Sequence, residues 1–312
     1  MEPLVYLDRK TGKEEAELVY GAKALQFLYG NDLLTNILGI PLLHLFIRNP
    51  IFSTFYGSWQ RSPLSKRKIQ PFIKAFQIDS SEFVEPIEKF NSFNDFFVRK
   101  LKLETRPKAP GADVAIIPAD GRYRFYPKLS ESDGFLVKNE KFCLDTLLED
   151  PSLAKKYQHG SMVIARLCPS DYHRYHFPCR CIPSETTLIN GWLYSVNPIA
   201  IKKNIHIFTL NKRTLCRLVT ENFGEILFLE IGATNVGSIH QTYVPGIVHE
   251  KGDEKGYFSF GASSLILLFE EGEIMFDEDL LAASARGMEI RCLMGQSMGK
   301  ALKQSANNGQ RM

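Results

Sequence analysis

A run of five apolar residues, 265–269 (LILLF), constrains the fold more than any other feature of the sequence. A strand with one solvent-exposed face alternates apolar and polar residues, so an uninterrupted apolar run predicts a strand that is buried on both faces. Two hydroxyl side chains, Ser263 and Ser264, stand directly before this run. Serines in such a place are ordinarily turn residues that hydrogen-bond their own backbone. The run therefore predicts a buried strand, and it raises the question of why two hydroxyls stand at its start.

The pattern of the chain changes along its length. Near the N-terminus, apolar residues recur on one helical face, and Gly30 is placed to end that helix; the residues are Leu18, Ala22, Leu25 and Tyr29. From Ile116 onward, short β-like runs are separated by Gly, Asn, Asp and Pro; examples are 162–167, 225–233, 257–260 and 265–269. We therefore predict an α+β fold, in which a helical, amphipathic region (residues 1–105) precedes a β-rich body of mainly antiparallel sheets (residues 106–312).

The most apolar stretch of the chain is residues 33–47. It is shorter than the roughly 20 residues that a membrane-spanning helix needs, and Asn36, Pro41 and His44 interrupt it. A spanning helix is therefore not expected. The stretch predicts either a pair of core helices or an element on a membrane surface, and the basic cluster at residues 66–68 favours the second.

Composition excludes several classes of protein. The 38 basic and 35 acidic side chains nearly cancel, so the overall charge indicates no nucleic acid or other polyanionic partner. Six cysteines in a chain of 312 residues do not form a disulfide framework, so we expect them to be reduced and mostly buried, as in the cytosol. The first residues carry charges where a secretion signal needs an apolar core.

Three segments carry groups suited to chemistry. Asp120 lies in a tight turn, PADG, where an aspartate is most often only a turn residue. His173 and His176 lie three residues apart in DYHRYHFP, and they are either structural histidines or an acid–base pair. The third segment, residues 232–243, has glycines that allow close backbone approach, with Thr234, Asn235 and Ser238 as polar groups; it suits either an anion contact or a turn between strands.

A zinc site is an alternative for the second segment, because Cys168, Cys179 and Cys181 lie near its histidines. The spacing lacks the paired CxxC arrangement of a structural zinc site, so we expect no metal.

An aspartate, a histidine and a serine are the groups that a hydroxyl nucleophile needs. An alcohol is a poor nucleophile until a base takes its proton, and the base works best when a carboxylate orients it. Asp120, His176 and Ser263 are able to fill these roles, although spacing alone does not show that they converge.

Six segments occur in the order found in phosphatidylserine decarboxylases: FNDFFVRKLK, PADGRY, DYHRYHFP, NGWLYSVNP, GATNVGSI and GYFSFGASSLILLF. They extend over residues 93–269, with weaker similarity on both sides. Six ordered segments are far more specific than any single motif, so the chain resembles this family of pyruvoyl-dependent, self-cleaving proenzymes.

The resemblance assigns a role to each candidate residue. Asp120 corresponds to the family's triad acid, His176 to the base and Ser263 to the self-cleaving serine, while His173 matches the histidine of the decarboxylation step. In this family the serine attacks the preceding carbonyl, the chain breaks between residues 262 and 263, and Ser263 becomes a covalent pyruvoyl group. Its carbonyl forms a Schiff base with the substrate amine and accepts the charge left at Cα, and a protonated group such as His173 then returns a proton.

The resemblance also implies partners and a location. We expect phosphatidylserine as the substrate, phosphatidylethanolamine as the product and an anionic membrane surface as a partner of residues 1–105. Residues 106–312 would then form the catalytic domain. The large and small fragments of the cleaved chain would stay associated. The sequence is compatible with a homodimer but does not indicate one. The expected location is peripheral, on the cytosolic face of the plasma membrane.

One position departs from the family pattern. Ala262 stands where the family has glycine before the cleaved serine. A β-carbon costs roughly 1–2 kcal/mol where the backbone needs a positive φ, so we expect slower or conditional cleavage. Two alternatives stay open: a non-cleaving lipid-binding protein of the same fold, and a pyruvoyl-dependent decarboxylase of another amino acid or aminolipid.

Overall fold

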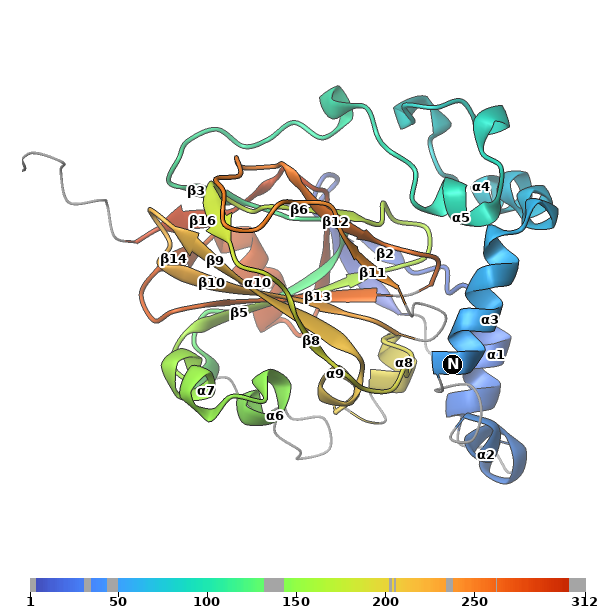
Figure 1. Cartoon of the computed structure of the whole chain (residues 1–312), viewed down its shortest axis with the longest axis horizontal. Coiled ribbons are helices and arrows are strands. Elements are labelled where there is room, and N and C mark those ends of the chain that lie inside the picture. The colour runs from blue at the N-terminus through green and yellow to red at the C-terminus, as the bar shows by residue number, and fades with distance from the viewer. Residues whose placement is uncertain are drawn as a thin grey trace, which may run out of the picture.

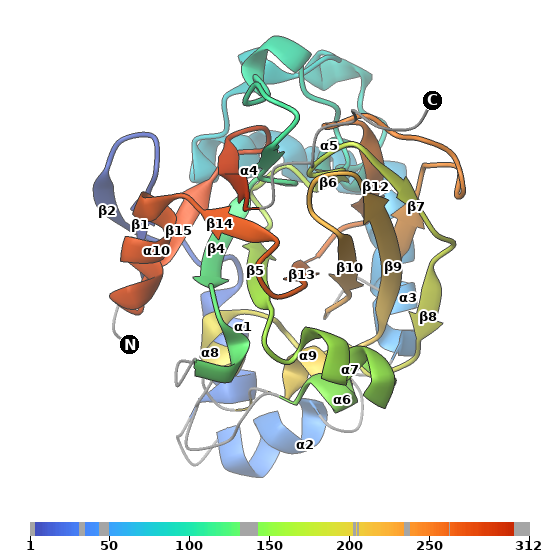
Figure 2. The ribbon, with the colours of Figure 1, turned by 90° about the vertical axis from the view of Figure 1, so that its left-hand side faces the viewer.

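Ten strands form one large sheet that passes through the centre of the protein (Figures 1 and 2). The computed structural model describes residues 4–30, 35–43, 50–131, 143–201, 204, 206–233, 238–261 and 263–302. The order in the sheet is β2-β1-β15-β4-β5-β13-β10-β9-β7, with β8 paired to β9. These strands are β1 (Val5–Asp8), β2 (Lys13–Ala16), β4 (Gly121–Tyr126), β5 (Ser161–Leu167), β7 (Cys181–Pro183), β8 (Thr187–Ile189), β9 (Arg213–Thr220), β10 (Glu225–Ile231), β13 (Ser263–Phe269) and β15 (Glu289–Cys292).

In the described residues, two three-stranded sheets complete the β structure. One contains β11 (Ile239–Gln241), β12 (Glu254–Phe258) and β6 (Arg174–His176), and the other contains β14 (Ile274–Phe276), β16 (Ser297–Ala301) and β3 (Val114–Ile116). Nearly all pairs are antiparallel; the exception among the paired strands is β1, which runs parallel to β15. The predicted α+β class with mainly antiparallel sheets is confirmed.

Strand β13 shows why the apolar run 265–269 has no polar alternation. Its neighbours β5 and β10 pair with it along both edges, and all seven of its side chains are buried. Leu265, Leu267 and Phe269 belong to one hydrophobic core, whereas Ile266 and Leu268 belong to another on the opposite face. The predicted burial on both faces is therefore confirmed.

Helices gather on one side of the β body, to the right in Figure 1. They are α1 (Ala22–Tyr29), α2 (Ile40–Leu42), α3 (Pro50–Arg61), α4 (Ile69–Phe76) and α5 (Phe93–Phe97). We call these helices, together with the π-helical segment Thr35–Gly39 and the 3₁₀-helix Pro63–Lys68, the helical layer. Helix α1 ends at Gly30, as predicted. Other short helices belong to the body: α6 (Leu144–Leu148), α7 (Pro151–Tyr157), α8 (Pro198–Ile201), α9 (Ile207–Leu210) and α10 (Glu278–Ala285).

A third, largely aromatic core joins the helical layer to the body. Phe72, Phe93 and Phe96 pack with their ring centroids 5.1–6.0 Å apart. Phe260, just before β13, contacts Phe93 and Phe97 at 5.1 and 4.9 Å. The layer is thus packed directly against the start of β13.

The first residues of the chain differ from the expected helical region. Strands β1 and β2 form a hairpin, and Tyr6 of β1 lies opposite Glu289 of β15, so this hairpin belongs to the large sheet of the body. Its strands are short and β2 (KEEA) is exposed throughout, so no apolar alternation signals them. The proposed boundary near residue 105 stays a prediction. This hairpin precedes that boundary in the chain but belongs to the sheet of the body.

The apolar stretch 33–47 lies only partly within the described residues. In that part, Leu43 packs into a core of the body, while Ile37, Leu38 and Leu42 are exposed. The stretch therefore shares features of both predicted alternatives. In the part of the chain that the structure describes, no helix combines the length and the apolarity needed to cross a membrane.

Candidate active site

Ser263, the first residue of β13, lies against a histidine from a distant segment. Its Oγ is 3.4 Å from Nδ1 of His173, and Nε2 of His173 is 2.9 Å from the backbone oxygen of Cys168. A carbonyl oxygen only accepts hydrogen bonds, so these partners assign the ring proton to Nε2. Nδ1 is then free to accept the hydrogen bond of the serine hydroxyl, which is the arrangement of a nucleophile beside a base.

His173 is held in its neutral form. It has no exposed surface, and the ring of Phe97 stacks on it with centroids 3.9 Å apart. Burial lowers the pKa of His173 to about 3, against the opposing effects of Asp171 and the Cys168 carbonyl. Near neutral pH the imidazole is therefore uncharged and available as an acceptor.

His176 binds two other partners. Its Nδ1 is 3.0 Å from the backbone oxygen of Gly252, and its Nε2 is 3.2 Å from the hydroxyl of Tyr172. By the same reasoning Nδ1 donates to the carbonyl, and Nε2 accepts from the tyrosine. Burial lowers the pKa of His176, while the Gly252 carbonyl, Glu254 and Asp120 act in the opposite direction.

Asp120 is bound by a buried arginine. Arg106 donates from Nε and Nη2 to both carboxylate oxygens at 2.7–3.1 Å, and the backbone N–H of Met294 adds a bond of 2.8 Å. The backbone N–H of His176 bonds the oxygen of Pro118, which places His176 beside the turn that carries Asp120.

The structure thus brings the predicted site residues together in a different pairing from the expected one. Ser263 contacts His173, whereas His176 and Asp120 are adjacent to each other but hydrogen-bonded elsewhere. The roles assigned by family resemblance remain predictions. Ala262 and residues 234–237 lie outside the described residues, so the predicted cleavage site is described only on its serine side.

The loop that carries His173 is held by Asp171. The carboxylate of Asp171 accepts the backbone N–H of Cys168 at 2.8 Å and binds Nη1 of Arg122 at 2.5 and 2.7 Å. The backbone N–H of Asp171 also bonds the Cys168 oxygen, the same atom that fixes His173. Asp171, Arg122, Arg106, Phe97 and Tyr172 were missed as site residues by sequence reasoning. Asp171 and Tyr172 lie within the quoted motif DYHRYHFP, and their closeness to the histidines was the available signal.

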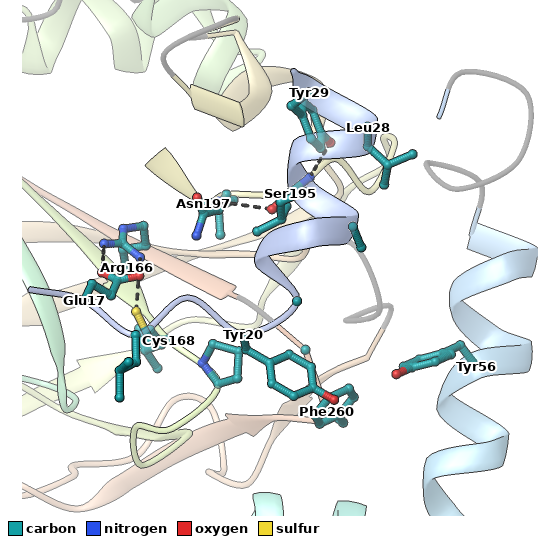
Figure 3. Close-up of a pocket in the computed structure, with 18 residues that line it drawn as sticks. Glu17, Tyr20, Leu28, Tyr29, Tyr56, Arg166, Cys168, Ser195, Asn197 and Phe260 are labelled. Atoms are coloured by element: carbon teal, nitrogen blue, oxygen red, sulfur yellow. Dashed lines mark hydrogen bonds and ion pairs between the residues drawn. The ribbon is translucent and has the colours of Figure 1, made fainter. Parts of the chain in front are cut away.

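A cavity of about 510 Å³ reaches the start of β13 (Figure 3). It is bordered by α1, by Tyr56 of α3 and by Cys168, Phe260 and Gly261 of the body. Gly261 has a φ of 141°, a conformation that favours glycine, two residues before Ser263. A second cavity, of about 460 Å³, is lined by Ser170, Asp171 and Tyr172, which follow Cys168 in the chain. Asp120 and Arg106 also line it. The two cavities therefore border consecutive parts of the loop that carries His173, the first at Cys168 and Pro169 and the second at Ser170, Asp171 and Tyr172.

The cysteines do not gather with the histidines. All six are free of disulfides, and all but Cys143 are buried, as predicted. Within the described ranges, no three His, Cys, Asp or Glu side chains are arranged to hold a metal ion.

Comparison with known proteins connects this site to a family. Residues 93–300 match the family model described as phosphatidylserine decarboxylase. A phosphatidylserine decarboxylase proenzyme of Chlamydia pneumoniae is 49% identical over 304 residues, which cover 97% of this chain and 99% of that protein. The corresponding proteins of Chlamydia caviae and Chlamydia trachomatis serovar D are 48% and 43% identical, covering 97% and 95% of this chain and 100% and 97% of those proteins. The resemblance seen in the sequence motifs is confirmed: the chain belongs to the phosphatidylserine decarboxylase family.

Proposed function

We propose that this chain is the proenzyme of a phosphatidylserine decarboxylase, which cleaves itself at Ser263 and forms phosphatidylethanolamine. The observation that carries the proposal is the contact between the Ser263 hydroxyl and a neutral histidine, at the start of a strand held on both edges. The curated relatives are named as proenzymes of this activity. A serine fixed by its strand, beside a base and a cavity, fits the precursor of a pyruvoyl group.

The residue roles follow the family resemblance. Ser263 attacks the carbonyl of residue 262, with His176 as its base and Asp120 as the acid that supports it. For His176 to accept the serine proton, its Nε2 must first leave the Tyr172 hydroxyl. The 3.4 Å contact favours a second candidate for the base, His173, which already meets the geometric condition.

After cleavage, the pyruvoyl group supplies an electron sink for the charge that remains when the substrate loses its carboxylate. His173 is the described side chain that contacts Ser263, and we assign it the return of a proton to the substrate. For this role its Nδ1, which carries no proton in the proenzyme, must first gain one. Phe97 and the Cys168 carbonyl hold its ring in one orientation for that transfer.

The fold explains how two fragments, residues 1–262 and 263–312, would stay together. β13 lies between β5 and β10, and β15 lies between β1 and β4, so strands of the small fragment are inserted between strands of the large one. β16 likewise pairs with β3. These ladders and the buried side chains of β13 support association without a covalent link.

We further propose that the helical layer binds an anionic membrane, at the cytosolic face of the plasma membrane. Phe55 of α3 is 78% exposed, and Leu64, next to the exposed cations Lys66 and Arg67, is 67% exposed. The larger cavity is bordered by α1 and by Tyr56, so it reaches this same layer. Apolar side chains beside cations are suited to the surface of an anionic bilayer.

The proposal is tested by the intact mass of the purified protein and by its release of CO₂ from phosphatidylserine. Wild type should give two chains, and the small one should change mass on borohydride treatment. Ser263→Ala should remain one chain without activity, whereas His159→Ala, an exposed histidine, should behave as wild type. A single wild-type chain that binds vesicles without releasing CO₂ would instead support the lipid-binding alternative.

The same assays distinguish the roles of the two histidines. Under the assigned roles, His176→Ala stays uncleaved, and His173→Ala cleaves but loses decarboxylation. If His173→Ala stays uncleaved while His176→Ala is processed, the base is His173.

A further inference from the structure

Arg166 of β5 is a buried guanidinium shared by two carboxylates. On one side, its Nε and Nη2 bind Glu289 at 3.1 and 2.6 Å. At the outer end of the fork, Nη1 and Nη2 bind the two oxygens of Glu17 at 3.3 and 2.7 Å. Nη1 also lies 3.1 Å from the sulfur of Cys168. The outer fork is the end of the guanidinium that faces Glu17.

This pair borders the larger cavity, close to the reacting serine. Arg166 lies opposite Ser264 in the β5–β13 register, and its neighbour Leu167 lies opposite Ser263. Glu17, Arg166 and Cys168 all line the cavity that reaches Gly261, and Figure 3 shows Glu17 and Arg166 facing each other. Among the described residues that line it, Arg166 is the only basic side chain and Glu17 the only acidic one.

The two carboxylates lie on different elements, and Glu17 also has a second arginine partner, Arg122, whose Nε is 3.6 Å from its Oε2. Glu289 belongs to β15, inside the large sheet, and Arg166 lowers its pKa despite burial. Glu17 follows the β1–β2 hairpin and precedes α1, in a connection that contains the 65% exposed Leu18 and ends at Gly21 with a φ of 69°. Glu17 is therefore the carboxylate that is able to leave Arg166 without disrupting a strand.

We propose that Glu17 occupies an oxyanion subsite of the active site, and that an anionic group of the substrate replaces it on the outer fork of Arg166. A guanidinium fork binds a carboxylate or a phosphate in the same two-point manner, so either anionic group of a phosphoserine headgroup fits this place. The exchange frees residues 18–21, which connect the body to α1, and thereby couples headgroup binding to the helical layer. This inference rests on the proposed function.

Glu17→Gln tests the exchange, with Glu14→Gln as a matched control. Glutamine keeps the size of the side chain and one acceptor oxygen but removes the competing charge. Glu14 is on the same hairpin, and its ion pair with Arg286 is exposed. The probes are sn-glycerol 3-phosphate, which carries only the phosphate, and N-acetyl-L-serine, which carries only the carboxylate; neither has the amine needed for reaction.

We expect Glu17→Gln to bind one of these probes about tenfold or more tightly, since a charge-assisted hydrogen bond no longer has to be displaced. The KM for phosphatidylserine should fall in the same variant, and Glu14→Gln should match wild type in both measurements. The probe that tightens identifies the anionic group. If Glu17→Gln binds both probes as wild type does, or more weakly, Glu17 is only an anchor and the proposal is wrong.

Hydrogen exchange of the wild-type protein supplies a second readout, which does not depend on the folding of a variant. A saturating probe should speed exchange of the amides of residues 18–21, because the connection is released. Unchanged or slower exchange there would overturn the proposal. Failure of the proposed function is distinct, since it would appear as absent cleavage and CO₂ release in wild type, whatever residue 17 is.

Discussion

The strand β13 and the helical layer are both rich in apolar residues, but they use them differently. Every side chain of β13 is buried, and its two faces belong to two separate cores. In the helical layer, Phe55, Leu64 and Ile37 remain 59–78% exposed. Strand β13 completes the interior of the body, whereas the layer keeps apolar side chains at its surface, with Leu64 close in the chain to the exposed cations Lys66 and Arg67. Similar local composition therefore serves stability in one region and, under the proposed membrane role, contact with a lipid surface in the other.

The largest expected effect tests the burial side of this comparison. Leu267 has no exposed surface, so Leu267→Ala should lower the free energy of unfolding by about 2–5 kcal/mol through the cavity it leaves. Phe55→Ala should change it by no more than about 0.5 kcal/mol, since that ring is already in water. Urea unfolding at a fixed protein concentration measures both. Equal losses in the two variants would remove the distinction between the regions.

The next effect concerns the exposed surface of the layer. If Phe55 inserts into a membrane, Phe55→Ala should weaken binding to anionic vesicles by about 1.5–3 kcal/mol, the value of burying one large apolar side chain. Binding should also weaken with added salt, since exposed charges are screened over about 8–10 Å at physiological ionic strength. Val219→Ala, at a 56% exposed position of the body, is the control that should leave vesicle binding unchanged. Vesicle binding that changes neither with salt, nor with lipid charge, nor in Phe55→Ala would contradict the membrane role.

A third effect should arise from a buried histidine of the body. The pKa of His173 lies near 3 in the folded protein against 6.5 in the unfolded chain, so the unfolded state binds more protons between these values. Stability is therefore fully present above pH 6.5 and is lost as the pH falls, by about 2 kcal/mol at pH 5 from this group. His176 acts in the same direction. Phe55→Ala should keep this pH dependence and His173→Ala should reduce it; an undiminished dependence in His173→Ala would exclude His173 as its source.

The smallest expected effect lies at the junction of the two regions. Gly261 has a backbone conformation that favours glycine, and the next residue is Ala262, where the family resemblance predicts glycine. If residue 262 also needs a positive φ, Ala262→Gly removes a cost of roughly 1–2 kcal/mol and speeds self-cleavage about tenfold. A time course of the small fragment on a denaturing gel measures the rate. Slower cleavage of the glycine variant would show that alanine is the favoured residue here.

Much of the fold could be predicted because its signals are local. Apolar runs such as 162–167 and 265–269 mark β5 and β13, since continuous apolarity is a direct consequence of burial on both faces. Helix α1 and its end at Gly30 follow from spacing and from a residue suited to end a helix. The ordered motifs were specific enough to indicate the family and to select Asp120, His173, His176 and Ser263 as candidates.

The tertiary structure decided which of these groups meet. Three residues separate His173 from His176, and only the fold of the loop held by Asp171 turns His173 toward Ser263 and His176 toward Tyr172. The pairing of Arg166 with Glu17 likewise joins segments far apart in the chain, and so does the addition of β1 to β15. Charged residues in short, exposed or irregular segments show no periodicity, because their partners are chosen by packing between distant elements. The buried strands and the family could thus be predicted from local pattern, while the pairing of charges and hydrogen bonds around Ser263 depends on contacts between distant segments of the folded chain.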